Sequence, residues 1–174
     1  MPSLVGSEMC IRDRVAAVQL TSTGNVTENQ ELALAKIREA AGNGARLIVL
    51  PEATAQNFRS GRLDEQAQTL EGPFATAIQA LAEELEVTVV AGMFCPADTV
   101  EREGKTINRV TNTALIAGPG VLGGYDKIHT YDAFDYRESD TVLAGESLVA
   151  FDVDDLIVGV ATCYDTVSYT HLTL

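Results

Sequence analysis

The stretch Leu47-Ile48-Val49-Leu50-Pro51-Glu52 decides the fold class, because it is a short apolar strand that delivers a carboxylate at its end. Two further apolar runs, Val15–Leu20 before it and Val87–Ala91 after it, also suit strands that are covered on both faces. Segments with helical periodicity separate these strands, over residues 27–41 and 72–85. The alternation of strand and helix predicts an α/β layered fold with helices packed on a sheet.

Both predicted helices carry end signals. Thr27 and Gln30 stand three residues apart, as in a capping box, so we expect Thr27 to cap the first helix. Gly42 and Gly44 mark the end of this helix, and Gly72-Pro73 opens the second one. The apolar residues of the second helix recur at helical spacing, at Phe74, Ile78, Leu81 and Leu85.

After residue 91 the pattern changes to strands alone. We expect strands over residues 112–117, 121–127, 148–152 and 157–162. Gly118-Pro119-Gly120 and the segment Asp152–Asp155 contain turn-forming residues, so each of them predicts a hairpin. No linker separates these parts, and we expect a single domain.

Composition limits the function classes. With 174 residues, of which 46% are hydrophobic, the chain is long enough for one domain with a core. Acidic residues outnumber basic ones 25 to 12, and the net charge of −13 argues against a nucleic-acid partner. No apolar run approaches the roughly 20 residues that span a bilayer, and we see no secretory signal. We therefore expect a cytoplasmic protein without membrane contact.

Cysteine and histidine are sparse in this chain. Cys10, Cys95 and Cys163 lack the paired spacing of metal ligands, and the only histidines are His129 and His171. We therefore expect neither a metal nor a cofactor, reduced thiols, and a packing role for Cys95.

Three polar residues, Glu52, Lys127 and Cys163, each follow or end an apolar segment. Loops at strand ends can bring such residues together at one cleft, where they would supply a base, a cation and a nucleophile. Each also has a plainer interpretation. Cys163 could be a buried apolar side chain, Glu52 an exposed loop acid and Lys127 an edge-strand lysine.

Three segments in register resemble the signature segments of the carbon-nitrogen hydrolase (nitrilase) superfamily. They are Leu-Pro-Glu at 50–52, Gly-Tyr-Asp-Lys-Ile-His at 124–129 and Val-Ala-Thr-Cys-Tyr-Asp at 160–165. The similarity spans residues 15–165. It implies a nitrilase-type αββα sandwich and a catalytic triad of Glu52, Lys127 and Cys163.

The resemblance also implies a mechanism. Glu52 would act as the base for the Cys163 thiol, and water would hydrolyse the resulting thioester. The Lys127 ammonium and the backbone N–H of Tyr164 would stabilise the oxyanion. The family has a second glutamate seven residues before a glycine, which corresponds to Glu138 and would orient Lys127 and the attacking water.

Within the superfamily, Lys127–Phe134 followed by Arg137-Glu138-Ser139 resembles the branch of omega-amidases and deaminated glutathione amidases. This implies a small-molecule ω-amide substrate and a homodimer at full length. A nitrilase or N-carbamoyl amidohydrolase, a non-catalytic α/β ligand-binding module and an inactive relative remain alternatives. A cysteine protease would need His129 as its base, whereas we expect a structural role for His129.

The two ends of the chain differ from the rest. Glu8–Asp13 and Val167–Leu172 can be encoded by opposite strands of one DNA duplex, and they resemble translated sequencing adapters. We therefore expect residues 1–14 and 166–174 to be non-native, and residues 15–165 to be the N-terminal part of a hydrolase domain, truncated after the nucleophile strand. In the family, the segment after the cysteine carries a substrate-binding arginine. We expect this fragment, without that segment, to be inactive.

Overall fold

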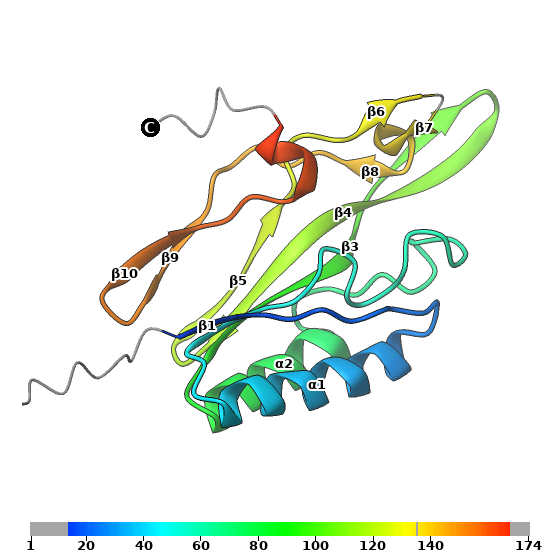
Figure 1. Cartoon of the computed structure of the whole chain (residues 1–174). Helices are drawn as coiled ribbons and strands as arrows, with labels where there is room; N and C mark the ends of the chain where they lie inside the picture. Colours follow the sequence, from blue (N-terminus) through cyan, green and yellow to red (C-terminus); the bar gives the residue numbers. More distant parts are fainter. Residues whose placement is uncertain (1–13, 135, 168–174) are drawn as a thin grey trace, which may run out of the picture.

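The computed structural model describes residues 14–134 and 136–167, which form helices and strands in the predicted alternation (Figure 1). The helices are α1, Val26–Gly42, and α2, Pro73–Glu84, and two 3-10 helices span Glu138–Asp140 and Cys163–Thr166. The strands are β1, Val15–Ala17; β2, Leu47–Val49; β3, Thr88–Arg102; β4, Lys105–Gly118; β5, Val121–Asp126; β6, Asp132–Ala133; β7, Tyr136–Arg137; β8, Val142–Leu143; β9, Ala150–Val153; and β10, Leu156–Gly159. No helix among these residues is long and apolar enough to cross a membrane.

The terminal segments 1–13 and 168–174, with Cys10 and His171, lie outside the described residues. The prediction that both ends of the chain are non-native concerns mainly these segments, and it stays a prediction.

The main sheet has the strand order β1-β2-β3-β4-β5, and β8 pairs with β4. β1, β2 and β3 are parallel, as the alternation with helices requires, whereas β3, β4 and β5 are antiparallel neighbours. The turn at residues 118–120 joins β4 to β5, as predicted. The register pairs Thr113 with Asp126, and the backbone N–H of Lys127, which directly follows β5, donates to the Asn112 carbonyl. The sheet thereby sets Lys127 beside Asn112.

The main core lies between the sheet and the two helices, which cover one of its faces (Figure 1). Ile37 of α1 and Phe74 and Ile78 of α2 are fully buried, as are Ile48 and Val89 of the strands. Fully burying one such side chain contributes roughly 1.5–3 kcal/mol, so this layer anchors the sheet whose strand ends carry the site.

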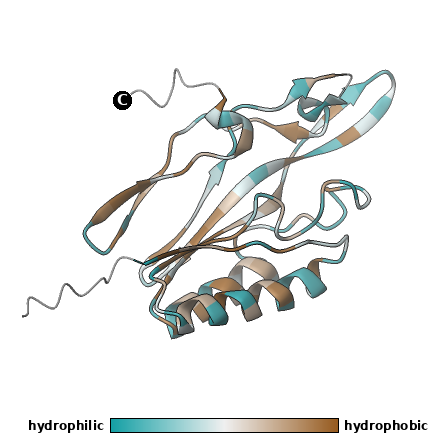
Figure 2. Ribbon diagram, in the orientation of Figure 1, coloured by the Kyte–Doolittle hydropathy of each residue, from teal (hydrophilic) through white to brown (hydrophobic). Residues whose placement is uncertain are grey.

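A second sheet, formed by β9 and β10, packs on the opposite face of the main sheet. Its Phe151 and Val153 form a smaller core with Leu47 and Ile116. Figure 2 shows this hairpin as largely hydrophobic, with a hydrophilic turn at its tip, as the predicted Asp152–Asp155 turn requires. The described residues thus form one helical layer and two sheet layers, which confirms a mixed α/β fold; they include no second helical layer.

The predicted capping box at the start of α1 is wrong. Asn25 is the N-cap, and its Oδ1 accepts hydrogen bonds from the backbone N–H groups of Thr27 (3.0 Å) and Glu28 (3.3 Å). Thr27 already lies in the first helical turn, so its hydroxyl cannot fill the cap position. At α2 the sequence signal is confirmed, because Gly72 is the N-cap and Pro73 the first helical residue.

The predicted strand lengths are also partly wrong. β1 ends at Ala17 instead of Leu20, whereas β3 and β4 continue as a long hairpin to a turn at Glu103-Gly104. Both turn residues have positive φ, 50° and 72°. A two-residue hairpin turn needs this conformation to match the right-handed twist of the flanking strands. The outer part of this hairpin is mostly exposed, so it lacks the apolar alternation that marks a strand in a sequence.

Candidate active site

The segment that carries Glu52 is fixed by a close approach to Gly92 of β3. The Gly92 N–H donates to the Pro51 carbonyl (3.1 Å), and the Gly92 carbonyl accepts from the Ala55 N–H (2.9 Å). A Cβ atom on residue 92 would lie 1.5 Å from the Glu52 carbonyl oxygen, so only glycine lets the two backbones pass this closely. Glu52 therefore has a defined position despite lying outside regular secondary structure.

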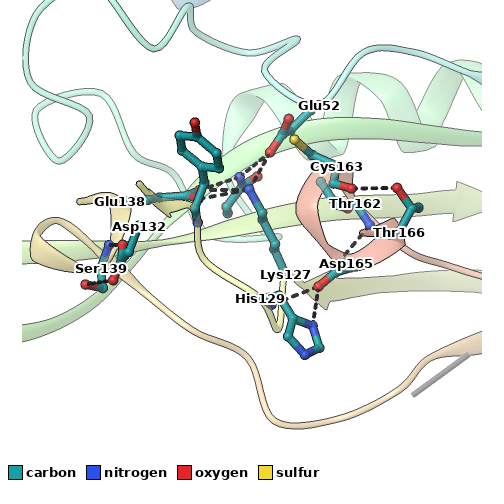
Figure 3. A network of polar contacts seen from close by, with 12 residues as sticks. Glu52, Lys127, His129, Asp132, Glu138, Ser139, Thr162, Cys163, Asp165 and Thr166 are labelled. Atoms are coloured by element: carbon teal, nitrogen blue, oxygen red, sulfur yellow. Dashed lines mark hydrogen bonds and ion pairs between the residues drawn. The ribbon is translucent and has the colours of Figure 1, made fainter. Parts of the chain in front are cut away.

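Lys127 is the buried cation of the site, with a side chain that is 2% exposed. Its Nζ donates to Glu52 Oε1 (3.1 Å) and to Glu138 Oε1 (3.1 Å) and Oε2 (2.9 Å), as Figure 3 shows. Burial alone would lower the pKa of Lys127, but the hydrogen bonds and charges of Glu138 and Glu52 outweigh burial and raise this pKa. Lys127 is therefore a fixed ammonium.

Glu138 is buried as deeply as the lysine it binds. It opens the 3-10 helix Glu138–Asp140, and its Oε2 also accepts the Tyr131 backbone N–H at 2.7 Å. A buried carboxylate needs such partners, because removing it from water costs several kcal/mol. The structure thus brings Glu138 into contact with Lys127, as the family resemblance implied.

Asn112 contacts both carboxylates, although the sequence alone assigns it no role. Its Nδ2 donates to Glu52 Oε1 (2.8 Å) and to Glu138 Oε1 (3.3 Å). Its Oδ1 is buried and has no hydrogen-bond partner among the described residues. Leaving this oxygen unpaired costs about 1–3 kcal/mol. The Asn112 side chain keeps this orientation because its Nδ2 binds the two carboxylates. Glu52 Oε1 thus accepts hydrogen bonds from two donors, Asn112 and Lys127.

Cys163 follows β10, which ends at Gly159 rather than at the predicted Thr162, after a short extended segment. It begins the 3-10 helix and has a φ of 49°, a left-handed conformation that costs a residue with a Cβ roughly 1–2 kcal/mol. This sharp turn exposes the side chain, and Figure 3 shows the sulfur directed toward the Glu52 carboxylate.

The Cys163 thiol has a raised pKa. Partial burial raises it most, the negative charge of Glu52 raises it further, and the positive charge of Lys127 opposes both only in part. The side chain is therefore mostly a thiol at neutral pH. It needs a base within reach before it can act as a nucleophile.

Asp165 holds the Cys163 turn; it ends the third signature segment, but the sequence alone assigns it no role. Its Oδ2 accepts from the Thr162 N–H (2.9 Å) and the Tyr125 hydroxyl (2.6 Å), and its Oδ1 from the backbone N–H of His129 (2.8 Å). Burial would raise the pKa of Asp165, but these hydrogen bonds outweigh burial and lower it. The network ties the turn to the end of β5.

His129 belongs to the same network. Its Nδ1 lies 3.0 Å from Asp165 Oδ1, and Figure 3 shows its ring away from the Cys163 sulfur. This placement gives no support to a cysteine–histidine protease, in which the ring would contact the thiol.

A cavity of about 480 Å³ opens over these residues, within the usual size range of small-molecule sites. It is lined by the four side chains predicted for catalysis, Glu52, Lys127, Glu138 and Cys163, and by Phe58, Arg59, Tyr131 and Tyr136. The N–H of Tyr164, the predicted oxyanion donor, lies in the first turn of the 3-10 helix, where an N–H has no acceptor within the helix. No cluster of His, Cys, Asp or Glu in residues 14–134 and 136–167 is arranged to hold a metal ion.

Comparison with known proteins agrees with the resemblance seen in the sequence. A family model described as carbon-nitrogen hydrolase matches residues 14–170. The chain therefore belongs to the carbon-nitrogen hydrolase family, which confirms the interpretation of the three signature segments. Among solved structures, XC1258 from Xanthomonas campestris, described as a CN-hydrolase superfamily protein, matches with a TM-score of 0.71 and 24% identity, over 87% of this chain and 53% of its own. This likeness confirms the fold.

Relatives with assigned names are also similar to most of this chain. A hydrolase of Mycobacterium tuberculosis is 40% identical over 157 residues, which are 87% of this chain and 52% of the relative. A deaminated glutathione amidase from Synechocystis is 35% identical over 86% of this chain and 57% of its own length. An omega-amidase from Danio rerio is 30% identical over 87% and 54%. The chain thus spans about half the length of these relatives.

Proposed function

We propose that the intact protein hydrolyses an amide bond of a small molecule through a thioester on Cys163. The observation that carries the proposal is the set of contacts that the Glu52 carboxylate makes. Its Oε1 binds Lys127 (3.1 Å) and Asn112 (2.8 Å), while its carboxylate faces a thiol with a raised pKa. A carboxylate fixed in this way is a base within reach of the nucleophile.

The reaction then runs in two steps. Glu52 takes the proton of the Cys163 thiol, the sulfur attacks the carbonyl carbon, and Lys127 and the Tyr164 N–H stabilise the oxyanion. The amine or ammonia leaves with the proton from Glu52, and the thioester remains. Glu52 next deprotonates a water, which attacks the thioester carbonyl and restores the thiol. Glu138 keeps Lys127 in place throughout.

The names of the relatives support an ω-amide of a small molecule as substrate. A nitrile or an N-carbamoyl compound is the alternative within the family. We further propose that the intact enzyme is a cytoplasmic homodimer without nucleic-acid or membrane partners. We also propose that residues 15–165 are the native part of this chain, that residues 1–14 and 166–174 are not native, and that this chain alone is inactive.

Trapping the thioester tests the function directly. The intact protein, expressed from the gene that encodes residues 15–165, is incubated with glutaramate and hydroxylamine. Hydroxylamine attacks the thioester in place of water, so we expect a hydroxamate from the wild type and none from Cys163→Ala or Glu52→Gln. The product is measured by mass spectrometry. Hydroxamate formation by Cys163→Ala, or nitrile hydrolysis without amide hydrolysis, would contradict the proposal.

A second prediction concerns the charge of Glu52. Because this charge raises the pKa of Cys163, Glu52→Gln should move the pH profile of Cys163 alkylation to lower pH. The rate of iodoacetamide labelling at Cys163 is measured from pH 6 to 10 by peptide mass spectrometry. Glu65→Gln is the control, because Glu65 is exposed and does not line the cavity. An unchanged profile in Glu52→Gln would favour the inactive relative.

A further inference from the structure

The side chain of Asn112 is buried between the two carboxylates of the site, with 1% of the residue exposed. Its Nδ2 donates to Glu52 Oε1 (2.8 Å) and to Glu138 Oε1 (3.3 Å), whereas its Oδ1 has no hydrogen-bond partner among the described residues. Turning the amide around would direct Oδ1 toward both carboxylates, which carry only acceptors when they are ionised. The two negative charges therefore keep Nδ2 in place, and Oδ1 stays unpaired as a result.

This donor is kept at a cost to stability. An unpaired buried oxygen destabilises the folded state, and a leucine of similar size at this position would avoid that loss. The backbone of Asn112 is fixed as well, because it pairs with Phe94 of β3 and its carbonyl accepts the Lys127 N–H (2.9 Å). A donor held so rigidly at such a cost indicates a role in the chemistry of the site.

Glu52 Oε1 is the oxygen that this donor occupies. It accepts from Asn112 Nδ2 at 2.8 Å and from Lys127 Nζ at 3.1 Å. Each oxygen of a carboxylate has about two lone-pair sites, and neither an amide NH2 group nor an ammonium can accept a hydrogen bond in return. A proton on Oε1 would therefore displace one of the two donors. Figure 3 shows the Cys163 sulfur directed toward this carboxylate, whose second oxygen, Oε2, is left to take the proton of the thiol.

Glu138 offers no site for the same proton. Its Oε1 accepts from Lys127 (3.1 Å) and Asn112 (3.3 Å), and its Oε2 accepts from Lys127 (2.9 Å) and the Tyr131 backbone N–H (2.7 Å). By the same count of lone pairs, both oxygens are occupied. Of the two carboxylates, only that of Glu52 can receive the proton.

We propose that Asn112 is a positioning residue that keeps the proton of the Cys163 thiol on Glu52 Oε2, from which it passes to the leaving amine. In acylation the S–H bond breaks and its proton moves to Oε2, while the sulfur electron pair bonds the carbonyl carbon and the π electrons move to the carbonyl oxygen. The oxyanion then reforms the C=O bond, the C–N electron pair stays on nitrogen, and this nitrogen takes the proton from Oε2. The inference rests on the proposed function and defines the proton route within it.

Two substrates of the intact protein separate the return of the proton from its removal. Glutaramate needs both steps, because an amine leaves only after it is protonated. p-Nitrophenyl acetate needs only the first step, because p-nitrophenolate leaves as a stable anion. The measured quantity is the ratio of hydroxamate formation from glutaramate, at saturating hydroxylamine, to the burst of p-nitrophenolate. Both rates are corrected with Cys163→Ala, and circular dichroism checks the folding of each variant.

We expect Asn112→Leu to lower this ratio about tenfold or more, since a positioned general acid contributes roughly 10²–10⁴-fold to such a reaction. The burst in the same variant is the reference for thiol reactivity. The matched control is Asn108→Leu, the same substitution four residues earlier on β4, at an exposed position that does not line the cavity. Its ratio should stay within about twofold of the wild type.

Asn112→Asp keeps the shape of the side chain and makes the donor depend on pH. Burial and the charges of Glu52 and Glu138 raise the pKa of the introduced carboxyl, against the opposing charge of Lys127. When protonated, this carboxyl can donate to Glu52 Oε1, and when ionised it offers only acceptors. Relative to the wild type at the same pH, the ratio should therefore be higher at pH 5 than at pH 8. A purely structural role of Asn112 predicts no such dependence.

An unchanged ratio in Asn112→Leu would overturn the proposal, and so would an equal fall in Asn108→Leu. A ratio in Asn112→Asp that follows the wild type at every pH would overturn it as well. Hydroxamate formation by the wild type, and its loss in Cys163→Ala, test the proposed function whatever these ratios are. The two proposals can therefore fail independently.

Discussion

Replacing Lys127 with methionine should lower the free energy of unfolding by about 3–5 kcal/mol at pH 7, as expected when one partner of a buried ion pair is removed. Methionine fills a similar volume but supplies no donor. The carboxylates of Glu52 and Glu138, which both bind the Lys127 ammonium at 2.9–3.1 Å, would then face each other without a cation between them. Glu138 is only 3% exposed, so water cannot replace the lost partner.

The effect of Lys127→Met should depend on pH in a defined direction. Although burial lowers the pKa of Lys127, Glu138 and Glu52 raise it, so its stabilising contribution is complete below the unfolded value of about 10.4 and is lost as the pH rises through the higher folded value. The stability difference from the wild type should therefore be constant near neutrality and shrink at strongly alkaline pH. Urea unfolding followed by circular dichroism between pH 6 and 11 measures this difference.

Two controls separate the ion-pair effect from a general loss of charge. Lys105→Met removes an exposed lysine in the turn region of the β3–β4 hairpin and should change stability by less than about 0.5 kcal/mol. Lys127→Met combined with Glu138→Gln should recover part of the loss, because it removes one of the two opposed charges. Wild-type stability of Lys127→Met at pH 7 would contradict the buried network.

The sequence predicts the elements that carry the site better than it predicts the contacts within it. The apolar segments before Glu52, Lys127 and Cys163 are visible as patterns, and the family segments identify these residues. Asn112 and Asp165 received no role from the sequence, although Asp165 ends the third signature segment, because their partners are distant in the chain. Each acts on residues far along the chain, Asn112 on Glu52 and Asp165 on Tyr125, and only the folded sheet brings the partners together.

The remaining errors have local causes. The exposed outer half of the β3–β4 hairpin is held by backbone pairing, which leaves no apolar periodicity in the sequence. At α1, two residues able to cap lie two positions apart, Asn25 and Thr27, and the backbone decides between them. The Cys163 turn, with its positive φ, is a further departure from local preference, and such departures concentrate at functional sites.

Asp165→Asn should lower the free energy of unfolding by about 3 kcal/mol and speed the alkylation of Cys163 at neutral pH, because the thiol would move away from the Glu52 charge that raises its pKa. The carboxylate accepts four hydrogen bonds, two on each oxygen. An asparagine in its place has only one acceptor oxygen, so its amide must face either the Thr162 N–H or the His129 N–H. Neither backbone donor can turn into an acceptor, and one of them loses its partner at a cost of about 1–3 kcal/mol, in addition to the lost charge-assisted bonds.

The stability difference between the wild type and Asp165→Asn should change with pH in one direction only. The pKa of Asp165 is lowered in the folded state, so its stabilising contribution is complete above the unfolded value of about 3.9 and is lost as the pH falls through the lower folded value. The difference between wild type and Asp165→Asn should thus be constant near neutrality and shrink below about pH 4. Urea unfolding at a series of pH values measures it.

The matched control is Asp155→Asn, the same chemical change at an exposed position in the β9–β10 turn, which should leave both stability and alkylation close to the wild type. If Asp165→Asn lost stability but kept the wild-type alkylation rate, the network would support the fold without setting the Cys163 turn. We expect both to change, because Thr162 directly precedes Cys163 and its N–H is one of the donors that Asp165 binds. The Asp165 network helps to offset the strain of the left-handed turn at Cys163, so freeing the Thr162 N–H releases the sulfur from its direction toward Glu52.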